Sequence, residues 1–242
     1  MFQIRSADER GHTQIDWQDS FHSFSFGDYY DPHFMGYSVL RVLNDDLVAP
    51  SGGFATHPHA NMEIVTVVIK GVLEHKDSLG NRYLIRPGEI QKMTAGSGIQ
   101  HSEFNPSLQD PVHFLQIWII PDEENIDPSY QQKSFEINEM ANKLRLIVSP
   151  TGEKESLLIH QDAYLYQCQL LQDGNVRYEA HPDRALWIQV AEGAVSVNDN
   201  PLIAGDGLAV WNEQMVLEIS GIDSQNNLIL MDFPQSLQRT AS

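Results

Sequence analysis

The stretch THPHANMEIVTVVIKGVLEH, residues 56–75, combines the two features that decide the fold and the candidate site. Its second half is a run of β-branched and aliphatic residues that ends at Gly71, as a strand before a tight turn does. Its first half places His57 and His59 on either side of a proline. Because proline donates no hydrogen bond to a neighbouring strand, this segment is an edge strand, a bulge or a strand start. The stretch therefore predicts β-structure that presents a pair of histidines.

The β pattern continues on both sides of this stretch. Short runs of Val, Ile, Leu and aromatic residues recur at roughly 8–12-residue spacing between Gly, Pro, Asn and Asp, as in all-β sandwiches and barrels. The segment DSLGNR, residues 77–82, predicts a hairpin turn. A weak internal repeat favours two copies of one barrel: Gly71 and Gly193 each follow a strand, and Gly88 and Gly207 each open the next.

A polar segment, residues 121–143, separates the two halves of the chain. It holds few β-branched residues, so we expect a linker with one or two helical turns. The pattern predicts an N-terminal domain over residues 1–122, a linker over 123–143 and a C-terminal domain over 144–242.

Composition limits the partners and the compartment. The formal net charge is −18, from 33 acidic and 15 basic residues, which argues against nucleic acids and anionic membranes. No apolar run is long enough to span a bilayer and no signal core is present, so we expect a cytoplasmic protein. The single cysteine, Cys168, excludes an intrachain disulfide and lies in an alternating strand-like run. A buried small hydrophobe is favoured there over a nucleophile.

The histidine pair has a counterpart further along the chain. Residues i and i+2 of a strand point to the same face, so His57 and His59 project together. His101 and Glu103 repeat this spacing. Two strands that each supply two ligand-type side chains predict an open metal site of three imidazoles and one carboxylate. Glu63 also matches the parity of His57, so spacing alone leaves open whether Glu63 or Glu103 is the fourth ligand.

The other histidines lack a second ligand-type residue at matching spacing. His181 lies in a segment similar to the first pair, but Asp183 stands where the second histidine would be. We therefore expect no metal site in the second half. The remaining histidines are expected to be surface or hydrogen-bonded residues: His12, His22, His33, His75, His113 and His160.

These residues resemble the two motifs of the cupin superfamily. The first motif is matched by His57, His59, Glu63 and Gly71, with one extra residue before the glycine, and the second by Gly88, Gly98, His101 and Asn105. Gly96 stands where the pattern has a proline, and the gap after Gly88 is two residues longer. Over residues 20–120 the chain resembles the pirin family nearly end to end.

The resemblance implies an all-β bicupin, with two β-sandwich (jelly-roll) barrels in tandem and metal only in the first. It implies His57, His59, His101 and Glu103 as ligands, and a structural or supporting role for Glu63. The cofactor would be one divalent transition metal ion, with Fe2+ favoured and Mn, Co, Ni, Cu or Zn as alternatives. Pirin family members are associated with quercetin 2,3-dioxygenase activity, while some act as metal-dependent transcriptional cofactors.

The resemblance favours a metal-dependent dioxygenase that cleaves the heterocyclic ring of flavonols such as quercetin with O2 and releases carbon monoxide. Glu103 is the candidate general base. Phe54, Met62 and Phe104 are candidate pocket residues, with core packing as the alternative. The aromatic segment 23–36 forms either a lid or packing between the barrels.

Two other functions stay open. One is a non-catalytic regulatory or protein-interaction pirin, and the other is a cupin enzyme acting on another small molecule without O2. The expected partners are a small aromatic substrate and O2. We expect a monomer rather than a dimer formed through edge strands.

Overall fold

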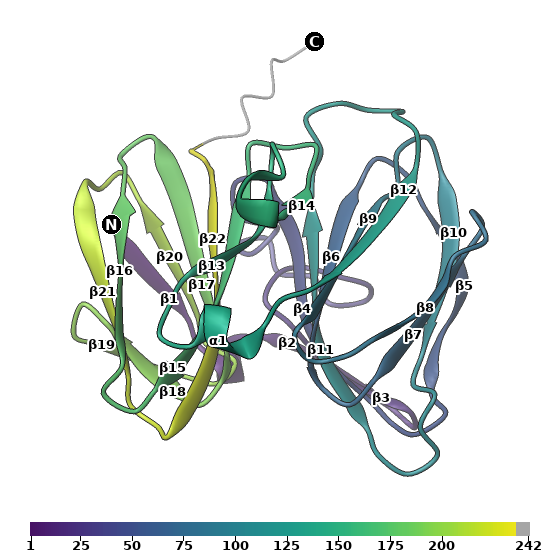
Figure 1. The fold of residues 1–242 in the computed structure, drawn as a ribbon, viewed down its shortest axis with the longest axis horizontal. Helices are drawn as coiled ribbons and strands as arrows, with labels where there is room; N and C mark the ends of the chain where they lie inside the picture. Colours follow the sequence, from purple (N-terminus) through teal and green to yellow (C-terminus); the bar gives the residue numbers. More distant parts are fainter. Residues whose placement is uncertain (236–242) are drawn as a thin grey trace.

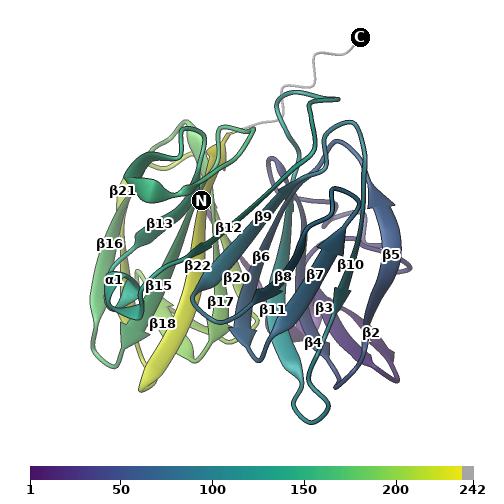
Figure 2. The same ribbon diagram turned by 45° about the vertical axis from the view of Figure 1, so that its right-hand side comes forward.

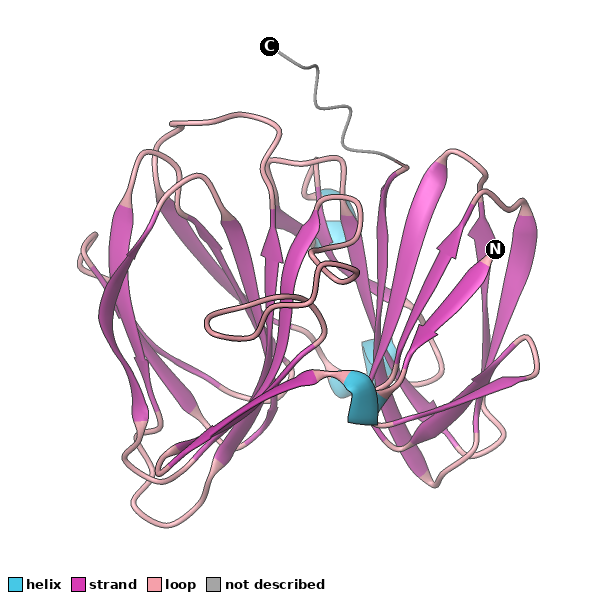
Figure 3. Cartoon of the chain, turned by 180° about the vertical axis from the view of Figure 1, so that it is seen from behind, coloured by secondary structure: helices cyan, strands magenta, loops and turns pink. Residues whose placement is uncertain are grey.

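The computed structural model describes residues 1–235 and consists of two β-barrels side by side (Figure 1). In each barrel a seven-stranded sheet faces a four-stranded sheet. Figure 3 shows that strands dominate the chain and that the few helical turns are short. The all-β bicupin expected from the sequence is confirmed. None of the helices within the described residues could span a bilayer.

The first barrel occupies the right of Figure 1, and Figure 2 brings its smaller sheet forward. The larger sheet runs β12-β9-β6-β11-β4-β3-β2 and the smaller one β5-β10-β7-β8. These strands are β2 (Gly11–Ile15), β3 (Gln18–His22), β4 (Leu40–Val48), β5 (Gly53–His59), β6 (Glu63–Lys70), β7 (Leu73–Asp77), β8 (Arg82–Ile85), β9 (Glu89–Thr94), β10 (Ile99–Phe104), β11 (Val112–Ile119) and β12 (Ser129–Ser134).

The second barrel repeats this order in its smaller sheet and in the central strands of its larger sheet. Its larger sheet runs β1-β20-β17-β22-β15-β13-β14 and its smaller one β16-β21-β18-β19. The repeat suggested by the glycines is therefore a repeat of topology. These strands are β1 (Phe2–Arg5), β13 (Arg145–Ser149), β14 (Leu157–Leu158), β15 (Tyr164–Leu171), β16 (Asn175–Ala180), β17 (Arg184–Glu192), β18 (Ala194–Val197), β19 (Asn200–Ile203), β20 (Gly207–Trp211), β21 (Met215–Gly221) and β22 (Gln225–Pro234).

Two strands lie outside the expected domain plan. β1 pairs with β20, so the first residues of the chain belong to the sheet of the second barrel. β12 lies within the predicted linker and pairs with β9 of the first barrel. The expected helical turn follows it as α1 (Ile137–Met140). The boundaries at 122 and 143 stay a prediction.

The main apolar layer lies between the two larger sheets. Val65 and Val67 of β6 belong to the same buried cluster as Ile147 of β13 and Phe233 of β22. β6 is buried along its whole length except at Lys70, because one face points into its barrel and the other meets the second barrel. A strand buried on both faces shows a continuous apolar run, and this explains the sequence of β6.

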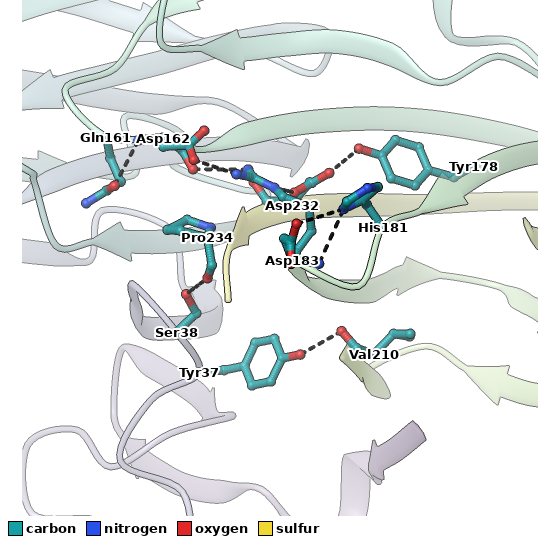
Figure 4. A network of polar contacts seen from close by, with 11 residues as sticks. Tyr37, Ser38, Gln161, Asp162, Tyr178, His181, Asp183, Val210, Asp232 and Pro234 are labelled. Atoms are coloured by element: carbon teal, nitrogen blue, oxygen red, sulfur yellow. Dashed lines mark hydrogen bonds and ion pairs between the residues drawn. The ribbon is translucent and has the colours of Figure 1, made fainter. Parts of the chain in front are cut away.

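Polar contacts add to this layer at one end (Figure 4). Tyr37 donates a hydrogen bond to the carbonyl of Val210 over 2.8 Å, and Ser38 donates to the carbonyl of Pro234. Both contacts join the segment before β4 to strands of the second barrel. Within that barrel, Arg184 bridges the carboxylates of Asp162 and Asp232.

The interiors of the two barrels are filled differently. The second holds one continuous apolar cluster that includes Cys168, as expected for a buried small hydrophobe. Burial raises the pKa of the Cys168 thiol to about 12, so the thiol stays protonated at neutral pH. The first barrel holds two smaller apolar clusters, and buried polar side chains lie in the remaining space. A site is therefore expected in the first barrel.

Glu63 lies on the side of β6 that faces the second barrel. Its Oε2 lies 2.7 Å from Nζ of Lys92 on β9, and both side chains are fully buried. Thr94 donates a hydrogen bond to the same oxygen over 3.2 Å. Glu63 is thus committed to an ion pair within the layer between the barrels.

Lys92→Met should lower the free energy of unfolding by roughly 3–5 kcal/mol, because it leaves the Glu63 carboxylate buried without its cation. The double change Lys92→Met with Glu63→Leu should recover most of this loss. Denaturant unfolding of the three proteins measures both effects. Equal stability of Lys92→Met and the unchanged protein would rule out a charged pair at this position.

Candidate metal centre

The candidate ligands lie on two neighbouring antiparallel strands of the smaller sheet. His57 and His59 are on β5, and His101 and Glu103 are on β10. His101 pairs directly with His57, and Glu103 pairs with Phe54 after an irregularity in the register. The two strands therefore bring the two i, i+2 pairs together on the face that lines the barrel interior.

The three histidines form a compact group. The ring centroids of His57 and His101 are 4.5 Å apart, and both lie 4.8 Å from the centroid of His59. One ligand nitrogen from each ring lies within 4.8 Å of the other two. This spacing fits three imidazoles around one metal ion, since each Zn–N bond, for example, is about 2.0–2.1 Å long.

The ring nitrogens are available for a metal. His57 donates its Nδ1 hydrogen to the carbonyl of Ala55 over 2.7 Å, which leaves a lone pair on Nε2. The Nε2 atoms of His59 and His101 are buried without a hydrogen-bond partner among the described residues. Burial, reinforced by the neighbouring imidazoles, lowers the pKa of His59 to about 4 and that of His101 to about 3. Both rings are therefore neutral at neutral pH, as metal binding requires.

Glu103 is buried beside the group with one oxygen free. Oε2 accepts a hydrogen bond from Nε2 of Gln116, whose own Oε1 accepts one from Trp118 over 2.8 Å. Oε1 has no partner among the described residues. Burial raises the pKa of Glu103. An oxygen without a partner next to imidazole nitrogens without partners fits a bound cation, because orphaned buried polar atoms are otherwise costly.

His75 is a functional candidate that the sequence reasoning placed only among hydrogen-bonded or surface residues. It is fully buried on β7, next to β10, and its Nε2 donates to Oδ2 of Asp77 over 3.0 Å. Its Nδ1 lies 3.5 Å from Nδ1 of His101. His75, His101 and Glu103 also form a second group of closely spaced ligand atoms. Because both nitrogens of His75 are engaged, it is better suited to orient His101 than to bind metal.

A cavity of about 290 Å³ opens beside the histidines. Phe54, His57, His59 and Glu103 line it, together with Phe26 and Trp118. Of the pocket residues predicted from the sequence, Phe54 lies at the cavity. Met62 and Phe104 are not among the residues that line it. Met62 packs in the apolar cluster around Ile64, and Phe104 lies against Gly53.

The aromatic segment 23–36 contacts both the second barrel and the cavity. Phe24 packs against Trp187 of the second barrel, with ring centroids 5.0 Å apart. Phe26 meets Trp118 edge-on at 5.4 Å and lines the cavity. The segment therefore packs between the barrels and also covers one side of the cavity.

The second barrel lacks an equivalent group within the described residues. His181 follows β16, the counterpart of β5, and 61% of its side chain is exposed.

Comparison with known proteins places both halves of the chain in known families. Residues 3–119 match the family model described as Pirin, and residues 146–233 match the model of the quercetinase C-terminal cupin domain. The chain is 45% identical to quercetin 2,3-dioxygenase of Escherichia coli strain K12 over 97% of this chain and 99% of the relative. The chain belongs to the pirin family.

A solved pirin structure has the same fold as this chain, and a further relative is similar in sequence. The E. coli pirin YhhW in complex with nickel(II) superposes with a TM-score of 0.90 at 45% identity, over 97% of this chain and 99% of that one. A putative quercetin 2,3-dioxygenase of Pasteurella multocida is 43% identical over 95% of this chain and 98% of the relative. The nickel complex of a pirin and the histidine and glutamate cluster of this chain together support a site for a divalent metal ion.

His75→Leu should weaken metal binding by about 10–100-fold, the usual effect of removing a residue that orients a ligand histidine. The reason is that His75 Nδ1 accepts the Nδ1 hydrogen of His101 and so keeps the lone pair on His101 Nε2. Chelator competition with Ni2+ or Fe2+ measures the affinity. His75→Asn, which retains a polar side chain at this position, should reduce the metal affinity less than His75→Leu does.

His181→Leu serves as the control, because this exposed histidine lies in the second barrel. Its metal affinity should equal that of the unchanged protein. Equal affinity of His75→Leu and this control, in folded proteins, would show that His75 does not orient His101.

Proposed function

We propose that His57, His59, His101 and Glu103 hold one divalent transition metal ion and that the protein is a dioxygenase that opens the heterocyclic ring of flavonols with O2 and releases carbon monoxide. One observation carries this proposal: a histidine triad with unpaired nitrogens, in which His101 is buried and His57 and His59 are half-buried, opens onto a cavity with aromatic walls. The names of the full-length relatives support the same substrate class. Fe2+ is the first candidate ion, and Ni2+ is the second because a related pirin binds it.

The cavity suits a flat aromatic molecule. Its volume of about 290 Å³ is close to the lower end of ligand pockets, about 300 Å³. Phe26, Phe54 and Trp118 supply aromatic surface. Rings of this kind bind an aromatic ligand by stacked or edge-on contacts and exclude water.

Glu103 and Gln116 have different roles in the proposed chemistry beside the metal ion. A bound divalent metal supplies a Lewis acid that polarises a flavonol's 3-hydroxyl and the neighbouring carbonyl. Glu103 would hold the ion through Oε1 before substrate binds, and on release from the ion the same oxygen would accept the proton of this hydroxyl, since it belongs to a buried carboxyl with a raised pKa. Gln116 holds the other oxygen, so the carboxyl keeps its orientation while it takes up the proton.

His101→Ala should abolish oxygen uptake with quercetin, because it removes one of the three imidazoles. The measurement uses metal-reconstituted protein, an oxygen electrode and detection of carbon monoxide in the headspace. His181→Ala should retain the full rate. Since quercetin oxidises unaided, a protein-free sample sets the background, and uptake no higher than this background by metal-loaded protein would refute the dioxygenase.

Glu103→Gln should lower the rate by about 10²-fold or more, because an amide cannot accept the hydroxyl proton. Metal content measured in the same sample separates this effect from loss of the ion. If the variant retains its metal and turns over quercetin at the original rate, Glu103 is not the general base.

A further inference from the structure

The cavity has a polar wall that the proposed chemistry at the metal does not use. Besides the histidines and aromatic rings, it is lined by Thr13, Gln18, His22, Asn44 and Asp46 from β2, β3 and β4. Three residues on adjacent strands form a row: Gln116 pairs with Asn44, and Asn44 pairs with His22. Because neighbouring strands are about 4.8 Å apart, this row extends about 10 Å across the sheet from Gln116.

Hydrogen bonding within the wall leaves a donor on Asn44. His22 Nδ1 lies 2.8 Å from Asn44 Oδ1, and His22 Nε2 lies 2.9 Å from Thr13 Oγ1. The amide oxygen can only accept, so Nδ1 carries the hydrogen and Nε2 accepts from Thr13. Burial lowers the pKa of His22, in agreement with a neutral ring. The Asn44 amide nitrogen then has no partner among the described residues and is free to donate.

Asp46 supplies an acceptor on the same strand face, two residues further along. Only 2% of the residue is exposed, and its Oδ1 accepts a hydrogen bond from Ser20. No cation pairs with it in the described chain, whereas its neighbour Asp45 points to the opposite face and pairs with Arg10 and His113. Burial raises the pKa of Asp46 to about 7. A buried carboxyl without a cation is unusual unless it meets a ligand.

We propose that Asn44 and Asp46 form a subsite that recognises the hydroxyl groups on the phenyl ring of a flavonol bound at the metal centre. A phenolic hydroxyl both donates and accepts, and it therefore matches an acceptor and a donor on one strand face. Phe26, Phe54 and Trp118 line the same cavity and hold the flat part of the molecule. This inference rests on the proposed function and specifies which flavonols the site prefers.

The test compares two flavonols that differ only on that ring. Quercetin carries two hydroxyls there and galangin carries none. Both are titrated into metal-loaded protein without oxygen, and binding is followed by the flavonol absorption band. The unchanged protein should bind quercetin at least about tenfold more tightly, since galangin lacks the hydroxyls that would bond to Asn44 and Asp46. Asp46→Leu and Asn44→Leu should each reduce this preference to less than about threefold, with galangin binding unchanged.

Two further variants keep the result interpretable. Asp46→Asn retains the size of the side chain and a group for Ser20 to contact, and it should also weaken the preference if the leucine variant does not fold. Asp19→Asn is the matched control, because Asp19 lies next to Ser20 on β3 but pairs with His12 outside the cavity. Its preference for quercetin should equal that of the unchanged protein.

The outcomes separate the subsite from the proposed function. Equal binding of the two flavonols by the unchanged protein would overturn the subsite and leave the dioxygenase standing. Variants that lose affinity for both flavonols equally would also overturn it, because a recognition residue acts on quercetin alone. Failure of both flavonols to bind the metal-loaded protein would overturn the proposed function and the subsite together.

Discussion

The antiparallel pairing of β5 with β10 is the constraint on which the candidate site depends. It places His101 directly opposite His57, and strand alternation brings His59 to the same face. Alternation along β10 likewise brings Glu103 inward beside His101 and His75. The irregularity inserts an extra residue on β5 between Phe54 and His57, and so Phe54 also faces the cavity. A shift of one residue in this register would turn the two ligand-type side chains of one strand away from those of the other.

The two barrels show that topology alone does not make a site. The orders of their central strands correspond, yet the second interior is filled by a continuous apolar cluster. In the first, Gln116 of β11 and Asn44 and Asp46 of β4 line the cavity, whereas the corresponding strands β22 and β15 contribute Leu228, Leu230, Cys168 and Leu170 to the apolar cluster. Close packing of aliphatic side chains leaves little room for a ligand. The first barrel retains a cavity because its inward polar residues hydrogen-bond along the walls.

The sequence predicted those parts of the site that lie within a single strand. The pairs His57 with His59 and His101 with Glu103 follow from local alternation. Glu63 seemed equivalent by parity, but the chain turns between β5 and β6, where Asn61 has a φ of +50°. Alternation does not carry across that turn, and Glu63 meets Lys92 instead. His75 and the polar wall depend on which strands are neighbours, and no local pattern encodes this.

The fold, like the site, could be predicted only where a strand carries its own sequence signal. Central strands such as β6 are recognisable because burial on both faces demands apolar residues. β12 escaped detection because its sequence, SYQQKS, is polar and only partly buried, and it is held by backbone pairing with β9.

β1 has a consequence for how the molecule is assembled. It pairs with β20, about two hundred residues later in the chain, and completes the larger sheet of the second barrel. During synthesis the first barrel can fold before β20 is made, whereas the second stays incomplete until β20 pairs with β1. Folding of the second barrel therefore depends on a segment that precedes the first, and removal of β1 would leave β20 as an open edge.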